Sequence, residues 1–206
     1  MPKRSPKPAR RLPKQRRSEE TAGVILDAAA QVLVREGYAR ATTNRIALRA
    51  GVSVGSIYQY FDDKNAIFDA LIDRFFGIVV DAVRSDPVDA SLPLQEVTRR
   101  LVTVGLRAWP LGLEILRLLE QVPDAGVRGR SGRAKAELHA LLHTIVEAHR
   151  DELRVEDLDE ALWLVLNAAE GMLYGIAPGD DVDRTAGEIA TMLSRYLLRD
   201  EAMARR

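Results

Sequence analysis

A single glycine in the stretch 42–70 constrains the fold more than any other feature of the chain. Gly51 interrupts a helical pattern, because glycine tolerates a positive φ and commonly lies just past the end of a helix. Three apolar residues at helical spacing precede it: Ile46, Ala47 and Ala50. The spacing predicts a helix over residues 43–50 that ends at this glycine.

A second, much shorter helix is predicted directly after the turn. Ser53 can cap its first turn by accepting a hydrogen bond from a free backbone N–H, and the helix extends to about Tyr60. A helix of this length is not stable alone. Two helices joined by a short glycine-containing turn form a helix-turn-helix, whose second helix fits the major groove of B-DNA.

An αα-hairpin used only for packing is the alternative interpretation of this pair. The second helix offers only Val54 and Ile57 as apolar side chains, whereas small and hydrogen-bonding residues fill the rest: Ser53, Gly55, Ser56, Tyr58, Gln59 and Tyr60. A glycine inside a helix costs about 1 kcal/mol relative to alanine. We interpret Gly55 as permitting close backbone approach to a partner, which favours the helix-turn-helix.

The charge distribution supports contact with nucleic acid near this unit. The net charge is zero, but residues 1–17 contain eight Lys or Arg and no acidic residue. Residues 18–84 contain seven basic and nine acidic residues, and residues 85–206 contain fifteen and twenty-one. Prolines and like charges in residues 1–17 predict a disordered arm that contacts phosphates or lies in the minor groove.

The segment from Ala41 to Lys64 resembles the DNA-binding domain of the tetracycline-repressor (TetR) family. The family's pattern, in order, is met by Thr42 or Thr43, Ile46, Ala47, Ala50, Gly51, Val52, Ser53, Gly55, Ile57, Tyr58, Tyr60, Phe61 and Lys64. The resemblance covers about residues 21–74, and the rest of the chain agrees with the family only in architecture. It implies a dimeric regulator that binds a palindromic operator sequence-specifically, acting as a repressor released by a small-molecule effector.

The family's DNA contacts carry over to individual residues. Thr43 would give its hydroxyl and backbone N–H to a phosphate, and Lys64 would contact another. Tyr58 and Tyr60 have hydroxyls that could reach phosphates, and Arg45 could bind a base or a phosphate. Ser53, Val54, Gly55, Ser56 and Gln59 would face base edges, where Gln59 could pair with adenine and Val54 could touch a thymine methyl.

Helical patterns without strand signals predict an all-α fold: a helix-turn-helix domain followed by a helical effector-binding and dimerisation domain. The expected division is 1–17 for the arm, 18–64 for the DNA-binding domain and 65–206 for the second domain. Helices are expected over 18–36, 63–84, 94–108, 111–121, 133–153, 157–176 and 183–199.

The last two helices are apolar over a broad arc, which suggests a four-helix homodimer interface, with an ordinary buried hairpin as the alternative. The residues expected at that interface are Leu162, Leu166, Ala169, Leu173, Ile189, Met192, Leu193 and Tyr196. The TetR resemblance favours the dimer.

The resemblance also implies an effector cavity among the C-terminal helices. Candidate lining residues are Phe75, Trp109, Leu113, Arg117, His139, His143, Trp163 and Asn167. Each of them is more commonly a plain core or surface residue, because ligand cavities and cores are built from the same apolar side chains.

Two functions other than a ligand-responsive regulator are compatible with parts of the sequence. His139, His143 and Glu147 share one helix face, and a His-x-x-x-His pair can bind zinc in an enzyme, although a solvated polar stripe explains the spacing more simply. The basic arm could also coat DNA without sequence preference. No nucleophile motif, P-loop or dinucleotide fingerprint is present, so we expect no enzyme activity, no cofactor and no metal.

The remaining composition fits a cytoplasmic protein. The chain contains no cysteine, which excludes disulfides and thiolate metal sites. No apolar run is long enough to span a membrane, because Glu170 interrupts the best candidate, and the basic start lacks the apolar segment of a signal peptide. We therefore expect no membrane partner.

Overall fold

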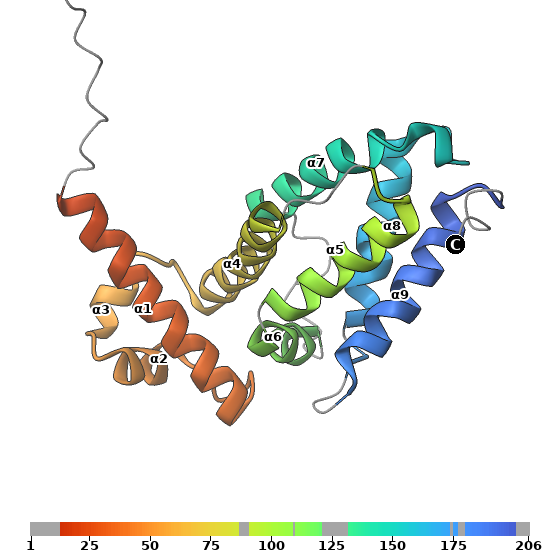
Figure 1. Ribbon diagram of the computed structural model, residues 1–206. Helices are drawn as coiled ribbons and strands as arrows, with labels where there is room; N and C mark the ends of the chain where they lie inside the picture. Colours follow the sequence, from red (N-terminus) through yellow and green to blue (C-terminus); the bar gives the residue numbers. More distant parts are fainter. Residues whose placement is uncertain are drawn as a thin grey trace, which may run out of the picture. The chain divides into compact units, whose positions relative to one another are not determined.

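The structure is a computed structural model that describes residues 13–86, 91–108, 110–120, 132–173, 175–176 and 180–200. Within these ranges the chain forms helices and no strand (Figure 1), apart from one isolated antiparallel bridge between Leu153 and Leu198. The all-α prediction is therefore confirmed. The chain divides into two compact units, residues 1–67 and 68–206.

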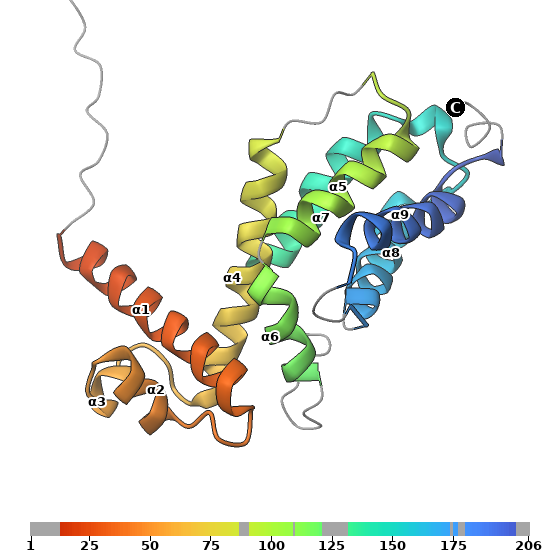
Figure 2. The same cartoon turned by 60° about the horizontal axis from the view of Figure 1, so that its bottom comes forward.

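The first unit contains α1 (Pro13–Glu36), α2 (Thr43–Ala50) and α3 (Val54–Ile57), together with the start of α4 (Lys64–Ser85). Helix α1 crosses α2 and α3, which lie together on one side of it (Figure 2). Buried apolar residues hold the three helices together: Ile25, Ala29, Leu33, Ile46, Ala47 and Ile57. The core residues supplied by α2 and α3 are those that the apolar spacing predicts.

Helix α1 begins earlier than predicted. The sequence predicts a start at residue 18, yet the helix starts at Pro13, inside the segment 1–17 expected to be disordered. Proline is compatible with the first position of a helix, because its missing N–H would have no partner there and its fixed φ suits the helix. The prediction for residues 13–17 is thus wrong, and residues 1–12 lie outside the described ranges.

The turn between α2 and α3 forms as the sequence predicts. Gly51 has φ of +69° and donates its N–H to the carbonyl oxygens of Ala47 and Leu48. Gly37, which ends α1, has φ of +76°. Such angles disfavour every residue with a side chain. The two glycines therefore set the directions in which α2 leaves α1 and α3 leaves α2.

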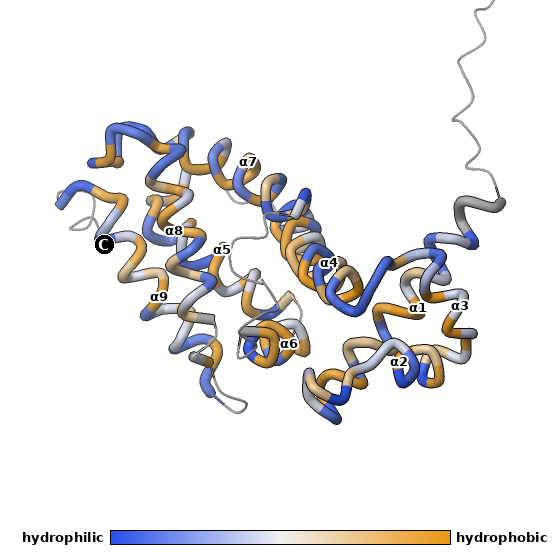
Figure 3. The backbone as a smooth tube through the Cα atoms, turned by 180° about the vertical axis from the view of Figure 1, so that it is seen from behind, coloured by the Kyte–Doolittle hydropathy of each residue, from blue (hydrophilic) through white to orange (hydrophobic). Residues whose placement is uncertain are grey.

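The second unit is a helical bundle made of most of α4 and six further segments. These are α5 (Leu94–Ala108), α6 (Pro110–Glu120), α7 (Arg133–Glu147), the 3-10 turn η1 (Arg150–Glu152), α8 (Leu158–Leu173) and α9 (Val182–Leu197). Helix α5 packs along α9 and α7 along α8. Hydrophobic and hydrophilic positions alternate along these helices (Figure 3), as they do in helices that bury one face.

Side-chain caps fix several of the helix starts. Asp63 caps α4 by accepting a hydrogen bond from the N–H of Ala66 at 2.8 Å. Asp181 caps α9 through the N–H groups of Asp183 and Arg184, at 3.0 and 3.1 Å. Each cap satisfies N–H groups that have no partner within their own helix.

The helix predicted over 133–153 ends early. Helix α7 stops at Glu147 and the chain turns through η1, so that Leu153 pairs with Leu198. His149 is buried beside Glu152, with Nδ1 2.9 Å from Oε1, and Glu152 also accepts from the N–H of Leu94 at 3.2 Å. These contacts join parts of the chain far apart in sequence and replace the last helical turns.

Candidate nucleic-acid interface and inner cavity

Ser53 organises the first turn of α3. Its Oγ accepts a hydrogen bond from the N–H of Ser56 at 3.0 Å and lies 2.7 Å from the hydroxyl oxygen of Ser56. Ile57 is fully buried and anchors the helix to the core of the unit. The cap and the anchor compensate for the short length of α3, which could not be stable by itself.

Helix α3 is shorter than predicted. It ends at Ile57 with Tyr58 as its C-cap, whereas the sequence suggested Tyr60. Helical hydrogen bonding nevertheless continues, because the N–H of Phe61 donates to the carbonyl of Ile57 at 3.0 Å. The predicted contact residues after Ile57 are therefore presented on tight turns.

Most of the predicted base- and phosphate-contacting residues of this region are at the surface. Ser53, Gly55, Tyr58 and Gln59 are exposed, with 54% of Tyr58 accessible, whereas Val54, Ser56 and Tyr60 are half-buried. A Cβ on Gly55 would meet only the hydroxyl of Ser53, at 3.8 Å, which is an ordinary contact. Packing within the protein therefore does not require glycine here, in agreement with a role toward an outside partner.

The start of α2 is also accessible. Thr42 caps this helix, with its hydroxyl oxygen 3.4 Å from the N–H of Arg45, and the neighbouring Thr43 is half-buried. The exposed Arg45 forms an ion pair with Glu36 of α1. The Arg45 side chain is 52% exposed, so a phosphate could reach its guanidinium group.

Lys64 occupies a different environment from the other predicted phosphate ligands. Its ammonium group donates to the carbonyl oxygen of Tyr38 at 3.2 Å and lies 3.7 Å above the centre of the Tyr38 ring. The Tyr38 hydroxyl in turn donates to Asn65 at 2.8 Å. Burial lowers the pKa of Lys64 below its ordinary value of 10.5, since burial disfavours the charged form.

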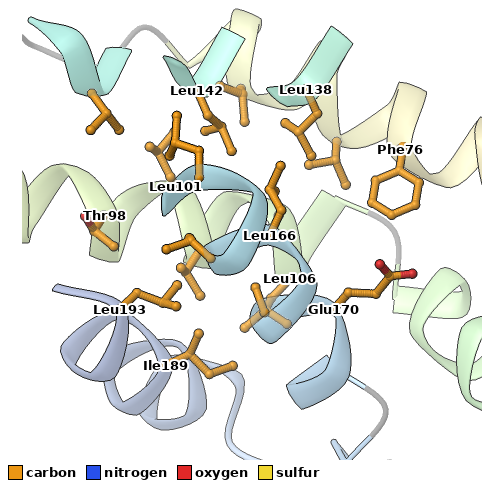
Figure 4. A pocket seen from close by; sticks show the side chains of 18 of the residues that line it. Phe76, Thr98, Leu101, Leu106, Leu138, Leu142, Leu166, Glu170, Ile189 and Leu193 are labelled. Atoms are coloured by element: carbon orange, nitrogen blue, oxygen red, sulfur yellow. The ribbon is translucent and has the colours of Figure 1, made fainter. Parts of the chain in front are cut away.

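The second unit contains an apolar cavity of about 140 Å³ that is partly open to its surroundings. Its walls come from α4, α5, α7, α8 and α9, and Figure 4 shows their side chains converging from several sides. The lining residues are Phe75, Phe76, Val79, Val83, Thr98, Leu101, Val102, Gly105, Leu106, Leu138, Leu142, Val146, Leu162, Val165, Leu166, Ala169, Glu170, Ile189, Leu193 and Leu197. A concave, mostly apolar site of this kind suits a small organic molecule.

Only one residue predicted to contact the effector, Phe75, is among those lining this cavity. Leu113, Arg117, His139, His143, Trp163 and Asn167 lie elsewhere, and Trp109 is outside the described residues. The polar candidates Arg117, His139, His143 and Asn167 are half-buried, and Trp163 is 60% exposed. A prediction made separately for each helix does not show which helix faces will line a common cavity.

The two histidines whose spacing would also suit a metal site, His139 and His143, both approach Asp159. His139 Nε2 is 3.4 Å from the Asp159 carbonyl oxygen, and His143 Nε2 is 3.6 Å from its carboxylate. Glu147 is exposed. Among the described residues, no three His, Cys, Asp or Glu side chains are grouped so that they could hold a metal ion.

Sequence reasoning missed a buried ion pair beside the cavity. Lys135 Nζ of α7 lies 2.5 Å from Glu170 Oε2 of α8, and each side chain is only 14% exposed. Neither residue stands in a recognisable motif. The one signal in the sequence is the acidic residue Glu170 inside the otherwise apolar run of α8.

Residues predicted for a dimer interface divide into two groups. Leu162, Ile189 and Leu193 are buried inside the subunit, and together with Leu166 and Ala169 they line the cavity. The three buried residues cannot form an exposed face, so the prediction is corrected for them, whereas Leu166 and Ala169 are half-buried. Met192 and Tyr196 are exposed, and the side chain of Leu173 is outside the described part.

The first unit has the construction of helix-turn-helix DNA-binding proteins, in which the second helix of the pair is left open for base edges. Comparison with known proteins agrees. Residues 25–71 match the sequence model of the tetR family of bacterial regulatory proteins, and residues 93–197 match that of the tetracyclin repressor-like C-terminal domain. The chain therefore belongs to the tetR family, whose members are transcriptional regulators and not enzymes.

Individual relatives support this assignment. The chain is 33% identical to the HTH-type transcriptional repressor Rv1474c of Mycobacterium tuberculosis over 170 residues, which cover 79% of this chain and 85% of the relative. A shorter match, 36% identical over 62 residues, covers 30% of this chain and 32% of a fatty acid metabolism regulator protein of Bacillus subtilis.

Solved structures show the same fold. The fatty acid degradation regulator FadR of Bacillus halodurans superposes with a TM-score of 0.67 at 22% identity, covering 84% of this chain and 94% of that one. SmeT, the repressor of a multidrug efflux pump in Stenotrophomonas maltophilia, gives 0.60 at 20% identity, covering 90% and 94%. At such identities the likeness concerns architecture alone. None of the described helices combines the length and the apolar character needed to cross a membrane.

Proposed function

We propose that this DNA-binding regulator is a cytoplasmic homodimeric repressor, which binds a palindromic operator and leaves it when a small molecule occupies the inner cavity. One observation carries the DNA-binding part. The buried side chain of Ile57 anchors α3 to the core of the unit, and the Ser53 side chain caps its first turn. The side chains of Ser53, Tyr58 and Gln59 remain exposed, and so does Gly55. A rigid support with an open polar surface suits the reading of base edges.

Exposed apolar residues on α8 and α9 support the homodimer. Trp163 and Leu164 are 60% and 41% exposed, and Met192 and Tyr196 are 49% and 38% exposed. The two helices contact each other, and each of them contributes two of these exposed residues. Apolar surface of this kind on neighbouring helices suits the two-fold contact of a homodimer, which would present two DNA-binding units to a palindrome.

The cavity supports effector control. It borders on α4, whose first residues belong to the DNA-binding unit and whose later residues Phe75, Phe76, Val79 and Val83 line the wall. A ligand that favours one arrangement of these side chains would change the population of the DNA-binding form. The printed name of the relative matched over 170 residues supports repression as the outcome.

Salt-dependent binding to operator DNA tests the DNA-binding part. Gly55→Glu places a carboxylate on the exposed surface of α3, and we expect it to abolish operator binding, since it would face phosphates and base edges. Ala136→Glu adds the same charge to an exposed position of α7 and should bind normally. Fragments selected from genomic DNA provide the operator, and fluorescence anisotropy measures binding.

The same titration separates sequence-specific binding from simple coating of DNA. A regulator should prefer the selected operator to a random duplex of equal length, and Tyr58→Ala should weaken that preference because Tyr58 is exposed beside α3. Equal affinity for the two duplexes at every salt concentration would contradict the proposal.

A further inference from the structure

The cavity wall carries a single charged side chain among its described residues. Glu170 of α8 lies at one end of the cavity on the same side as Phe76, and Thr98 lies at the other end (Figure 4). The Thr98 hydroxyl already donates to the carbonyl oxygen of Leu94 at 2.8 Å. A ligand inside the cavity therefore meets hydrocarbon almost everywhere and a carboxylate at one end.

That carboxylate is held by an exchangeable cation. Lys135 reaches Glu170 from α7 and also approaches the Asn167 side-chain oxygen at 3.4 Å and the Phe76 ring centre at 5.6 Å. Lys135 itself does not line the cavity. A lysine ammonium sits on a flexible stem and can move outward to water while its methylene groups stay packed. Another cation could then take its place from within the cavity.

The sign of the wall charge discriminates between ligands. An anionic head group would lie against the Glu170 carboxylate in an environment where charges interact far more strongly than in water. A cationic head group would replace the Lys135 ammonium and keep the carboxylate paired, which avoids the large penalty of leaving a buried charge alone. A neutral ligand would gain only from burial of its apolar surface.

We propose that the inner cavity selects small lipophilic amines, with Glu170 as the residue that pairs with their ammonium group and Lys135 as the cation they displace. This inference rests on the proposed effector role of the cavity and names the chemical class that it takes. The volume of about 140 Å³ is close to the roughly 150 Å³ of an engineered apolar cavity that binds benzene, so a body of about six carbons fits.

Three ligands with the same six-carbon chain test the selection: hexylamine, 1-hexanol and hexanoate. We expect calorimetry at neutral pH to rank the amine above the alcohol and the alcohol above the carboxylate. Glu170→Gln keeps the size of the side chain and an oxygen that can accept from Lys135, and it should weaken the amine about tenfold while the alcohol is unchanged. Glu137→Gln, the same exchange at an exposed ion pair with Arg84, should alter neither.

Removal of the lysine instead of the glutamate provides a second test of the proposed pairing. Lys135→Met removes the competing cation and keeps an apolar stem, so amine affinity should rise. Circular dichroism checks that each variant is folded. Hexanoate binding as tightly as hexylamine, or a Glu170→Gln variant that loses the alcohol and the amine equally, would overturn the proposal.

The operator readout is kept separate from ligand binding. If hexylamine binds as expected and operator affinity does not change, the cavity selects amines and the proposed release by an effector fails. If hexanol and hexanoate release the operator as well as the amine does, release stands and the selection for amines is overturned.

Discussion

Lys64 is the first residue of α4 and connects this helix to Tyr38, which follows the end of α1. Its ammonium contacts both the carbonyl and the ring of Tyr38, and the Tyr38 hydroxyl binds Asn65, so two consecutive residues of α4 are tied to one tyrosine. The family resemblance implies a phosphate contact for Lys64. An ammonium group has three donors, and a phosphate could therefore be added to the contact with Tyr38 or replace it.

The lowered pKa of Lys64 gives a prediction for stability. Because burial holds the folded-state pKa below 10.5, the unfolded chain binds more protons than the folded one between the two values. The free energy of unfolding should thus rise with pH as the pH climbs through that window. Denaturant unfolding of the wild type and of Lys64→Met, from about pH 8 upward, measures the difference, which should grow in favour of the wild type. A difference that falls with pH would contradict the burial argument.

At the scale of single elements, the contact between α4 and the start of α7 explains why a glycine stands at position 132. Gly132 precedes α7 and has no side chain to cap it. Asp73 of α4 supplies the cap instead, because its Oδ1 accepts from the N–H of Ala134 at 2.9 Å. A Cβ on Gly132 would lie 2.2 Å from that same oxygen, so any larger residue must displace the cap.

A double-mutant cycle tests this account. Gly132→Ala and Asp73→Ala should each lower the free energy of unfolding by about 1 kcal/mol, the usual cost of a lost cap. The double variant should be little worse than either single one, since both changes remove one hydrogen bond. Gly23→Ala in α1, where a Cβ would meet nothing within 4 Å, is the control and should be neutral or stabilising. Additive losses would show that the two residues act independently.

The element boundaries show what a sequence can and cannot predict. Gly51 ends a helix through its backbone freedom and Ser53 begins one through its side-chain cap, so local reading found both. The end of α7 depends on the contact of Glu152 with Leu94 and on the bridge between Leu153 and Leu198, which no local pattern reveals. The early start of α1 was missed because Pro13 was interpreted only as a helix breaker.

The functional surfaces divide in the same way. The residues predicted to contact DNA lie in one short motif whose order of residues is highly specific, so the prediction could be made from the chain alone. The cavity is formed by five helices, and a broad apolar arc on α8 or α9 does not show which part faces inward. Leu162 and Leu193 were therefore assigned to a dimer interface although they face the cavity.

At the scale of the whole molecule, the exposed apolar surface of α8 and α9 predicts the oligomeric state. Trp163→Asp and Met192→Asp should each convert a dimer to monomers, because a carboxylate buried at the interface would lack a partner. Sedimentation equilibrium measures the mass, and operator affinity should fall with it since a palindrome needs two binding units. Leu48→Asp, at a site that is 84% exposed in the other unit, should leave the mass unchanged. Wild-type protein that sediments as a monomer at micromolar concentration would contradict the assignment.

The hollow between α4, α5, α7, α8 and α9 also has a mechanical consequence. Hydrostatic compression favours states in which empty interior space is eliminated, so the second unit should loosen under pressure before the first. Gly105→Ala would add a methyl group to the wall at 3.7 Å from Val79, an ordinary contact, and should make the unit harder to compress. High-pressure NMR of methyl groups can follow both units at once. A ligand that fills the cavity should therefore lower the compressibility of the second unit.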